Sequence, residues 1–266
     1  MEVALVTVGD EVLAGDTVNT NANWLAGELA DRGTLVARVL TVPDDRAVIA
    51  DAVREYADAF DAVVCTGGIG GTPDDVTVEA VADALDRALV VDPAQRERVA
   101  ARAAAFRDAN PDMVERYDFE LDLDAAATLP EGARAITTDE SWSPGCVVEN
   151  VYVLPGIPAE MRAMFATIAD AFAGDATSTV VYTWTPEGAL LDVIDAVRER
   201  FDVRVGSYPR GDETPGRVKV TGTDPDAVAS AAALVRERIE LADAPGDGEE
   251  SDDRTETGDR DPGGDA

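Results

Sequence analysis

Residues 62–77 read AVVCTGGIGGTPDDVT, and this stretch decides how the rest of the chain is interpreted. A short apolar run at Ala62–Cys65 predicts a buried strand, four glycines follow it, and the segment from Asp75 to Leu85 predicts an amphipathic helix. A glycine-rich connection of this kind lets backbone amides approach an anion, and the helix N-terminus adds partial positive charge. The glycines alone fit a phosphate-binding loop or an ordinary tight turn equally well.

The segments around this stretch repeat the alternation of strand and helix. Continuous apolar runs predict strands buried on both faces, and apolar residues at helical spacing predict helices. We expect strands at residues 3–8, 34–42 and 62–65, helices at 19–32, 44–56 and 75–85, a helical excursion at 93–120, short strands within 134–154 and a closing helix at 156–172. This order predicts an α/β fold with a doubly wound, mostly parallel sheet.

Three regions differ in composition and pattern. Residues 1–173 carry the α/β pattern. Residues 177–241 predict a small domain in the order strand, helix, strand, strand, helix, with Asp224 as the cap of the last helix and Pro225 at its first position. Residues 243–266 are dominated by Asp, Glu and Gly. That composition lacks the apolar surface needed to offset the entropy of ordering, so we expect a disordered acidic tail.

Composition excludes several classes of function. The chain has 266 residues with 54 acidic and 22 basic side chains, a formal net charge of −32, and no histidine. A Ser-His-Asp triad and an imidazole metal ligand are therefore excluded. The negative charge repels phosphate backbones, so we expect no nucleic-acid partner. Because no apolar run is long enough to span a membrane and the N-terminus lacks the basic start of a secretory signal, we expect a cytoplasmic protein without membrane contact.

Lysine and cysteine are both scarce. All the basic side chains except Lys219 are arginine, and an acidic chain nearly free of lysine resembles the proteomes of halophiles that accumulate salt. We therefore interpret much of the acidity as adaptation to salt, which screens charge repulsion. Cys65 and Cys146 are too few for a zinc site of cysteines alone. We expect both to be small buried residues, although one bridge between them stays open.

Acidic residues near the glycine-rich stretch are the candidate catalytic groups. Asp75 follows the glycines, where a carboxylate repels a bound phosphate unless a cation lies between them, and this pairing indicates Mg²⁺ or a similar metal. Asp44 and Asp45 follow the second expected strand, and one of them is expected to join Asp75 at the same sheet edge, where the pair holds a metal or positions water. The alternative interpretation is ordinary helix capping. The candidate catalytic residues are Asp75, Asp44 and Asp45, with Asp75 and Asp45 as metal ligands.

The candidates for ligand binding lie in loops between expected strands and helices. Each of these loops also has the plain interpretation of a turn or a helix cap, with Thr17 or Asn19 as a cap of the first helix. The candidate ligand-binding residues are Gly9, Asp10, Glu11, Thr66, Gly67, Gly68, Gly70, Thr72, Thr77, Pro144, Gly145, Pro155, Gly156 and Glu160.

Four motifs together resemble a known family. TGGIGGTPDDVT at 66–77, GDEVLAG at 9–15 with N-x-N downstream, TVPDD at 41–45 and LPGIPAEM at 154–161 occur in the order seen in the MoaB/Mog molybdopterin-binding domain. The details GDEVLAGDTVNTNANWLAGEL and TPDD are most similar to the CinA-like (competence/damage-inducible protein A) branch. The resemblance covers about residues 1–172.

The resemblance implies a crevice for a small phosphate-bearing pterin or nucleotide. In CinA-like proteins the fold is linked to metal-dependent cleavage of diphosphates such as ADP-ribose, so the resemblance implies this reaction with Mg²⁺, Mn²⁺ or Co²⁺. In molybdenum-cofactor enzymes, the carboxylates that match Asp75 and one of Asp44 or Asp45 act in Mg²⁺-dependent adenylyl transfer to molybdopterin. Such a transferase is one alternative, and a module that binds molybdopterin without catalysis is another.

The resemblance also concerns the surroundings of the site. The small domain with Ser207-Tyr208-Pro209 resembles the one that follows in CinA-like proteins. The chain stops before the amide-hydrolysing domain of longer members, so we do not expect it to deamidate nicotinamide nucleotides. Because family members are often dimers or trimers, the resemblance also implies a homo-oligomer. The sequence departs from the family at Ile69 and Gly71. It departs further at 139–143, where DESWS replaces the usual Asn, Gly, Thr, Ala, and this change bears on which ring the site accepts.

Overall fold

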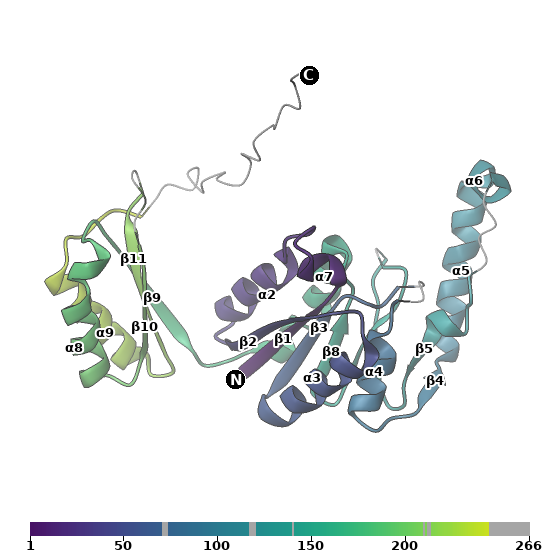
Figure 1. Cartoon of the computed structure of the whole chain (residues 1–266), viewed down its shortest axis with the longest axis horizontal. Helices are drawn as coiled ribbons and strands as arrows, with labels where there is room; N and C mark the ends of the chain where they lie inside the picture. Colours follow the sequence, from purple (N-terminus) through teal and green to yellow (C-terminus); the bar gives the residue numbers. More distant parts are fainter. Residues whose placement is uncertain (71–73, 117–120, 140, 210, 212–213, 245–266) are drawn as a thin grey trace, which may run out of the picture. The chain divides into compact units, whose positions relative to one another are not determined.

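The computed structural model describes residues 1–70, 74–116, 121–139, 141–209, 211 and 214–244 (Figure 1). Thr72 and residues 245–266 of the expected acidic tail therefore lie outside the described residues. The chain divides into two compact units, Met1–Ala176 and Thr177–Ala266, and each unit is described by itself.

A six-stranded sheet forms the centre of the first unit, in the order β2-β1-β3-β8-β7-β6. The first four strands run parallel, and β7 pairs antiparallel with both β8 and β6. The strands are β1 Glu2–Val8, β2 Leu35–Val42, β3 Ala62–Thr66, β6 Arg134–Ile136, β7 Gly145–Val148 and β8 Val151–Leu154. The predicted α/β fold with a mostly parallel sheet is confirmed.

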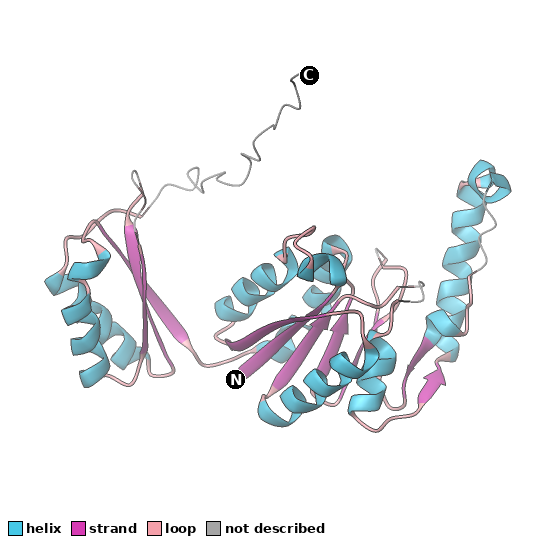
Figure 2. Ribbon diagram, viewed as in Figure 1, coloured by secondary structure: helices cyan, strands magenta, loops and turns pink. Residues whose placement is uncertain are grey.

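Helices cover both faces of this sheet (Figure 2). On one face α2 and α7 contribute Leu25, Leu29 and Phe165 to the core, and on the other α3 and α4 contribute Ile49 and Val81. The helices are α2 Thr20–Asp31, α3 Arg46–Ala59, α4 Thr77–Ala84 and α7 Pro158–Ile168, which continues as the 3₁₀ turn η2 Ala169–Phe172. Burial on both faces explains the continuous apolar runs in the central strands.

The helices start later than the apolar pattern suggests. Asn19 lies outside α2 as its cap, and its Oδ1 accepts a hydrogen bond of 3.1 Å from the Ala22 amide. The helix α4 begins at Thr77 rather than at Asp75. A one-turn helix, α1 Asp10–Leu13, also follows β1 and is too short for periodicity to predict.

An arm made of α5 (Pro93–Ala109) and α6 (Pro111–Arg116) leads away from the central sheet (Figure 1). The strand before the arm, β4 Leu89–Val91, pairs antiparallel with the strand after it, β5 Thr128–Pro130. The 3₁₀ turn η1 Ala125–Ala127 directly precedes β5. The helical excursion expected at 93–120 is thus two helices in its described part. The helix α5 also carries Arg98, which donates hydrogen bonds to the carbonyls of Thr138 and Ser141 in the loop before β7.

The second unit is a three-stranded antiparallel sheet, in the order β10-β11-β9, with two helices packed on it. Its elements are β9 Thr177–Thr183, the 3₁₀ turn η3 Glu187–Ala189, α8 Leu191–Arg200, β10 Arg204–Tyr208, β11 Gly216–Gly222 and α9 Pro225–Arg238. Asp224 Oδ1 accepts from the Asp226 and Ala227 amides and so caps α9, as expected. In the described parts of both units, we find no helix that is long and apolar enough to cross a membrane.

The two cysteines lie on β3 and β7, on either side of Val153 in β8. Cys65 and Cys146 are both buried and free. Burial raises the pKa of each thiol to about 12. The thiols are therefore neutral core groups, as expected, and no bridge joins them.

Candidate functional site

Four parallel strands end side by side at Val8, Val42, Thr66 and Leu154, and the loops beyond them enclose a cavity of about 550 Å³. Its position at the carboxyl ends of the strands is where open α/β sheets bind ligands. The cavity is lined by Val8, Gly9, Glu11, Asp44, Gly67, Gly68, Ile69, Gly70, Asp74, Asp75, Trp142, Ser143, Pro155, Gly156, Ile157, Pro158 and Glu160.

The glycine loop after β3 is fixed by close backbone contacts. Gly67 and Gly68 have φ angles of 97° and 65°, in the left-handed region that favours glycine. A Cβ on Gly67 would collide with the Val8 carbonyl oxygen, and a Cβ on Gly68 with the Thr77 hydroxyl. Only glycine therefore fits at both positions, and the bare loop backbone faces the cavity.

Thr77 holds this loop from behind. Its side chain is buried, its Oγ1 donates a hydrogen bond of 2.8 Å to the Gly67 carbonyl, and its amide donates one of 3.0 Å to the Gly68 carbonyl. The Gly67 amide in turn donates to the Leu154 carbonyl at 3.1 Å. Thr77 was expected to bind ligand, but it does not line the cavity, so it is a positioning residue.

Among the described residues, five carboxylates line the cavity: Glu160 on one wall, and Glu11, Asp44, Asp74 and Asp75 in the segments that follow β1, β2 and β3. Asp44 Oδ2 accepts a hydrogen bond of 2.9 Å from the Asp10 backbone amide. Burial raises the pKa of Asp44, the bond from Asp10 lowers it in part, and the charges of Asp10, Glu11 and Asp74 raise it further. Burial is thus the main cause of the raised pKa, and the neighbouring carboxylates add to it.

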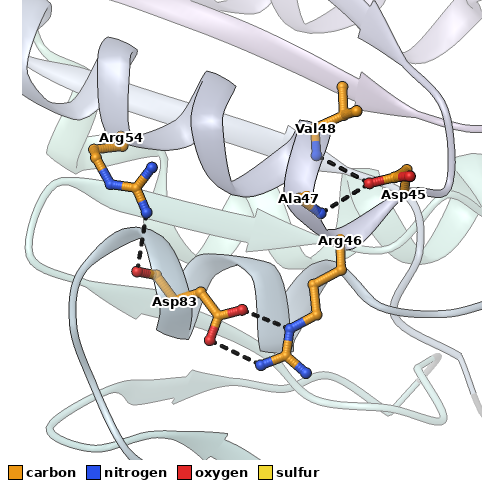
Figure 3. Close-up of polar contacts among 6 residues, drawn as sticks. All are labelled: Asp45, Arg46, Ala47, Val48, Arg54 and Asp83. Carbon is orange, nitrogen blue, oxygen red and sulfur yellow. Dashed lines mark hydrogen bonds and ion pairs between the residues drawn. The ribbon is translucent and has the colours of Figure 1, made fainter.

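Asp45 points elsewhere, although it is the neighbour of Asp44. Its Oδ1 accepts hydrogen bonds of 2.9 Å from the Ala47 amide and 3.1 Å from the Val48 amide, so it caps α3 (Figure 3). It does not line the cavity. Of the two carboxylates that the sequence left open, the structure places Asp44 at the cavity and Asp45 at a helix cap, which corrects the pairing of Asp75 with Asp45.

The start of α3 is also tied to α4. The Arg46 guanidinium donates to both carboxylate oxygens of Asp83, at 2.6 and 2.8 Å, and Arg54 donates to the Asp83 carbonyl at 3.3 Å (Figure 3). The ion pair lowers the pKa of Asp83. The helices that follow the Asp44 loop and the glycine loop are thus fixed to each other.

Gly70, Asp74 and Asp75, which precede α4 in the chain, also line the cavity. A Cβ on Gly70 would collide with Asp75 Oδ2, so the carboxylate lies directly over the glycine. In the described residues, no group of three or more His, Cys, Asp or Glu side chains is arranged to hold a metal ion. The donors do fit Mg²⁺, which is commonly held by one or two carboxylates together with substrate phosphates.

The opposite wall carries Glu160, at the start of α7, and the loop before β7. Burial raises the pKa of Glu160, although the Trp142 amide and the charges of Arg102 and Arg98 lower it in part. Pro144 and Gly145 are buried beneath this wall and do not line the cavity. Their expected contact with ligand stays a prediction.

The other predicted residues divide between the cavity and its surroundings. Thr66 lines an adjacent cavity of about 100 Å³, which shares Val8 and Glu11 with the main one. Asp10 contributes its backbone amide to Asp44 rather than a lining side chain. The predicted residues that line the main cavity are Gly9, Glu11, Asp44, Gly67, Gly68, Gly70, Asp75, Pro155, Gly156 and Glu160.

Several lining residues were not singled out from the sequence. They include Asp74, Ile157 and Trp142. The signal for Trp142 was present, because it is a large aromatic residue inside the polar segment DESWS. Asn21, the second Asn of the N-x-N motif, donates a hydrogen bond of 2.7 Å from its Nδ2 to the Gly156 carbonyl, which joins α2 to the cavity wall.

Replacing Asp45 with Ala tests the capping role. Asp45→Ala leaves two amides at the start of α3 without their acceptor, and we expect the free energy of unfolding to fall by about 1 kcal/mol. Denaturant titration of Asp58→Ala, an exposed position in the same helix, is the control and is expected to show no such loss. An unchanged stability of Asp45→Ala would contradict the cap.

Replacing Asp44 with Asn tests the crowding of charge. Because its folded pKa is raised, the stability linked to Asp44 is fully present below its unfolded pKa of about 4 and is lost as pH rises through the folded value. At pH 7 and low salt, Asp44→Asn is therefore expected to have a higher Tm than the parent protein.

The gain in Tm should shrink below about pH 4 and in about 1 M salt, where the repulsion is removed or screened. Asp58→Asn is the control for the general relief of negative charge in an acidic protein. A lower Tm for Asp44→Asn than for the parent at pH 7 would show that the bond from Asp10 outweighs the repulsion.

Comparison with known proteins agrees with this architecture. A family model for a probable molybdopterin binding domain matches residues 4–173, and a model for the middle domain of FAD synthase matches residues 175–244. A protein of Archaeoglobus fulgidus is 35% identical over 243 residues, which cover 90% of this chain and 98% of the relative.

Two CinA proteins are also similar. A CinA-like protein of Citrifermentans bemidjiense is 31% identical over 96% of this chain and 62% of its own length. The crystal structure of the protein CinA, of unknown function, from Thermoplasma acidophilum has 30% identity and a TM-score of 0.56, and the match covers 64% of this chain and 97% of that one. The chain therefore belongs to the MoaB/Mog family of molybdopterin-binding domains, with CinA-like proteins among its relatives.

Proposed function

We propose that this protein binds a phosphate-bearing nucleotide or pterin in the 550 Å³ cavity and cleaves a nucleotide diphosphate, such as ADP-ribose, with a divalent metal ion. The observation that carries the proposal is that a bare glycine loop shares one cavity, at the ends of four parallel strands, with the carboxylates of Glu11, Asp44, Asp74 and Asp75. The match to a molybdopterin binding domain supports a phosphate-bearing ring compound as ligand.

The glycine loop supplies the anion site. Gly67, Gly68 and Gly70 present backbone without side chains, and the N-terminus of α4 follows, so amide dipoles are concentrated at this edge. Thr77 and the Val8 carbonyl keep the loop in place. Because the loop is fixed, it can orient a diphosphate without reorganising.

The carboxylates require a cation when such a ligand binds. Two like unit charges about 4 Å apart repel by about 4 kcal/mol at an effective dielectric constant of about 20. Asp75 and Asp44 are the residues that would hold the metal, with Asp74 and Glu11 beside them. When bound, a divalent metal neutralises charge at phosphorus and lowers the pKa of a bound water.

The proposal is tested by incubating the protein with ADP-ribose in salt, with and without Mg²⁺, Mn²⁺ or Co²⁺. We expect metal-dependent release of AMP and ribose 5-phosphate, and metal-dependent stabilisation against heat, since a ligand at about 100 times its Kd adds about 2.7 kcal/mol. Binding of molybdopterin without any product would favour a non-catalytic module. Formation of adenylylated molybdopterin from ATP and Mg²⁺ would favour adenylyl transfer.

Asp75→Asn tests the principal metal ligand. The amide keeps the shape of the side chain but removes its charge, so we expect kcat for metal-dependent cleavage to fall at least about a hundredfold. The Tm without ligand should stay close to that of the parent. Full turnover by Asp75→Asn would contradict the role of Asp75 as a metal ligand.

Gly70→Ala tests the contact between the loop and Asp75. The added methyl group collides with Asp75 Oδ2 and displaces the carboxylate. We expect turnover to fall by about 10- to 100-fold, because a shift of about 1 Å is costly in a reacting site. Gly27→Ala is the matched control, since nothing lies within 4 Å of its added methyl group on α2. Equal activity of the two variants would contradict the contact.

A further inference from the structure

The wall opposite the carboxylate-rich loops carries an aromatic side chain without an assigned role. Trp142 is the one aromatic residue among the described residues that line the 550 Å³ cavity, and 37% of its surface is exposed. Ile157, on the same cavity, is 59% exposed. Large apolar surface thus faces a cavity whose other side consists of glycines and carboxylates.

The backbone of the Trp142 loop is fastened to the arm. Arg98, on α5, donates from Nη2 to the carbonyls of Thr138 and Ser141, each at 2.7 Å, and to Ser141 Oγ at 3.1 Å. Its Nη1 donates to the Trp142 carbonyl at 3.2 Å. One half-buried guanidinium therefore fixes the backbone on both sides of Glu140, which lies outside the described residues.

The indole ring is fastened separately. The Arg102 guanidinium lies 5.0 Å from the centre of the Trp142 ring and also donates to the Asp139 carbonyl. Phe106 meets the indole edge-on, with ring centres 5.4 Å apart. Three residues one turn apart on α5, namely Arg98, Arg102 and Phe106, thus set the position of the loop and its ring.

We propose that Trp142 is a specificity-determining residue that stacks on the aromatic ring of a ligand whose phosphate lies on the Gly67–Gly70 loop. The proposal rests on the proposed function, and it names the substrate class as purine, pterin or flavin phosphates rather than phosphates of sugars alone. A cavity of 550 Å³ accommodates a ligand of that size. Stacking on a ring that is already held loses little entropy on binding.

A structural role is the plain alternative. Trp142 also borders an apolar cavity of about 400 Å³ with Phe106, Met113 and Leu121. If the indole served only to join the loop to the arm, its removal would affect every ligand of the site equally. A loss confined to ligands with a ring separates the two roles.

The test compares two phosphate probes, AMP and ribose 5-phosphate, each with Mg²⁺. Trp142→Ala is expected to weaken AMP binding by about tenfold or more, the usual effect of losing one stacked ring. Binding of ribose 5-phosphate should change less than twofold. Trp142→Phe, which keeps a ring and the contact with Phe106, should retain most of the AMP affinity even if Trp142→Ala loosens the loop.

Fluorescence gives a readout that a structural role would not move. The chain has three tryptophans, and a variant with Trp24→Phe and Trp184→Phe leaves Trp142 as the sole indole. AMP should quench its emission, and ribose 5-phosphate should not. An equal loss of both probes in Trp142→Ala, or AMP binding without quenching, would overturn the proposal. A parent protein that binds neither probe would instead overturn the proposed function on which it rests.

Discussion

The hydrogen bond from the buried Thr77 hydroxyl to the Gly67 carbonyl is the contact on which the rest of the site depends. It joins the end of β3 to the start of α4 and holds Gly67 and Gly68 in a turn that no side chain would permit. Because the turn is closed in this way, the loop backbone faces the cavity, and the Asp75 carboxylate lies directly over Gly70. The anion site and the nearest carboxylate are therefore products of the same constraint.

That constraint creates an electrostatic conflict, which gives the site its chemistry. The amides of the loop favour an anion, whereas Glu11, Asp44, Asp74 and Asp75 oppose one. The carboxylates also oppose one another, since the charges of Asp10, Glu11 and Asp74 add to the effect of burial in raising the pKa of Asp44. In the proposed function, a divalent cation would resolve it together with a phosphate, since two or so carboxylates leave the coordination of Mg²⁺ incomplete. The absence of histidine from the sequence agrees with chemistry that uses oxygen ligands and backbone amides.

The part of the site at the strand ends could be predicted because each of its residues stands directly after an expected strand. The glycines, Asp75 and Pro155-Gly156 stand directly after strands, and parallel strands bring such positions to one edge. Asp44 and Asp45 could not be separated, because adjacent side chains in a loop point in different directions and only the cap hydrogen bonds decide which one turns inward. Thr77 was placed correctly along the chain, but whether its hydroxyl faced ligand or backbone depended on the turn geometry.

The wall that carries Trp142 could not be predicted in the same way, because contacts from α5, far away along the chain, hold it in place. Arg98 and Arg102 reach carbonyl groups about 40 residues away along the chain, and nothing in an alanine- and arginine-rich helix indicates which loop it will hold. The DESWS segment had been noticed only as a departure from a family pattern. Its position beside the cavity gives that departure a physical meaning: the strand ends supply the glycine loop, and the arm holds the wall that carries Trp142. If the proposed stacking on Trp142 holds, selectivity for a ring can change through the arm while the glycine loop stays the same.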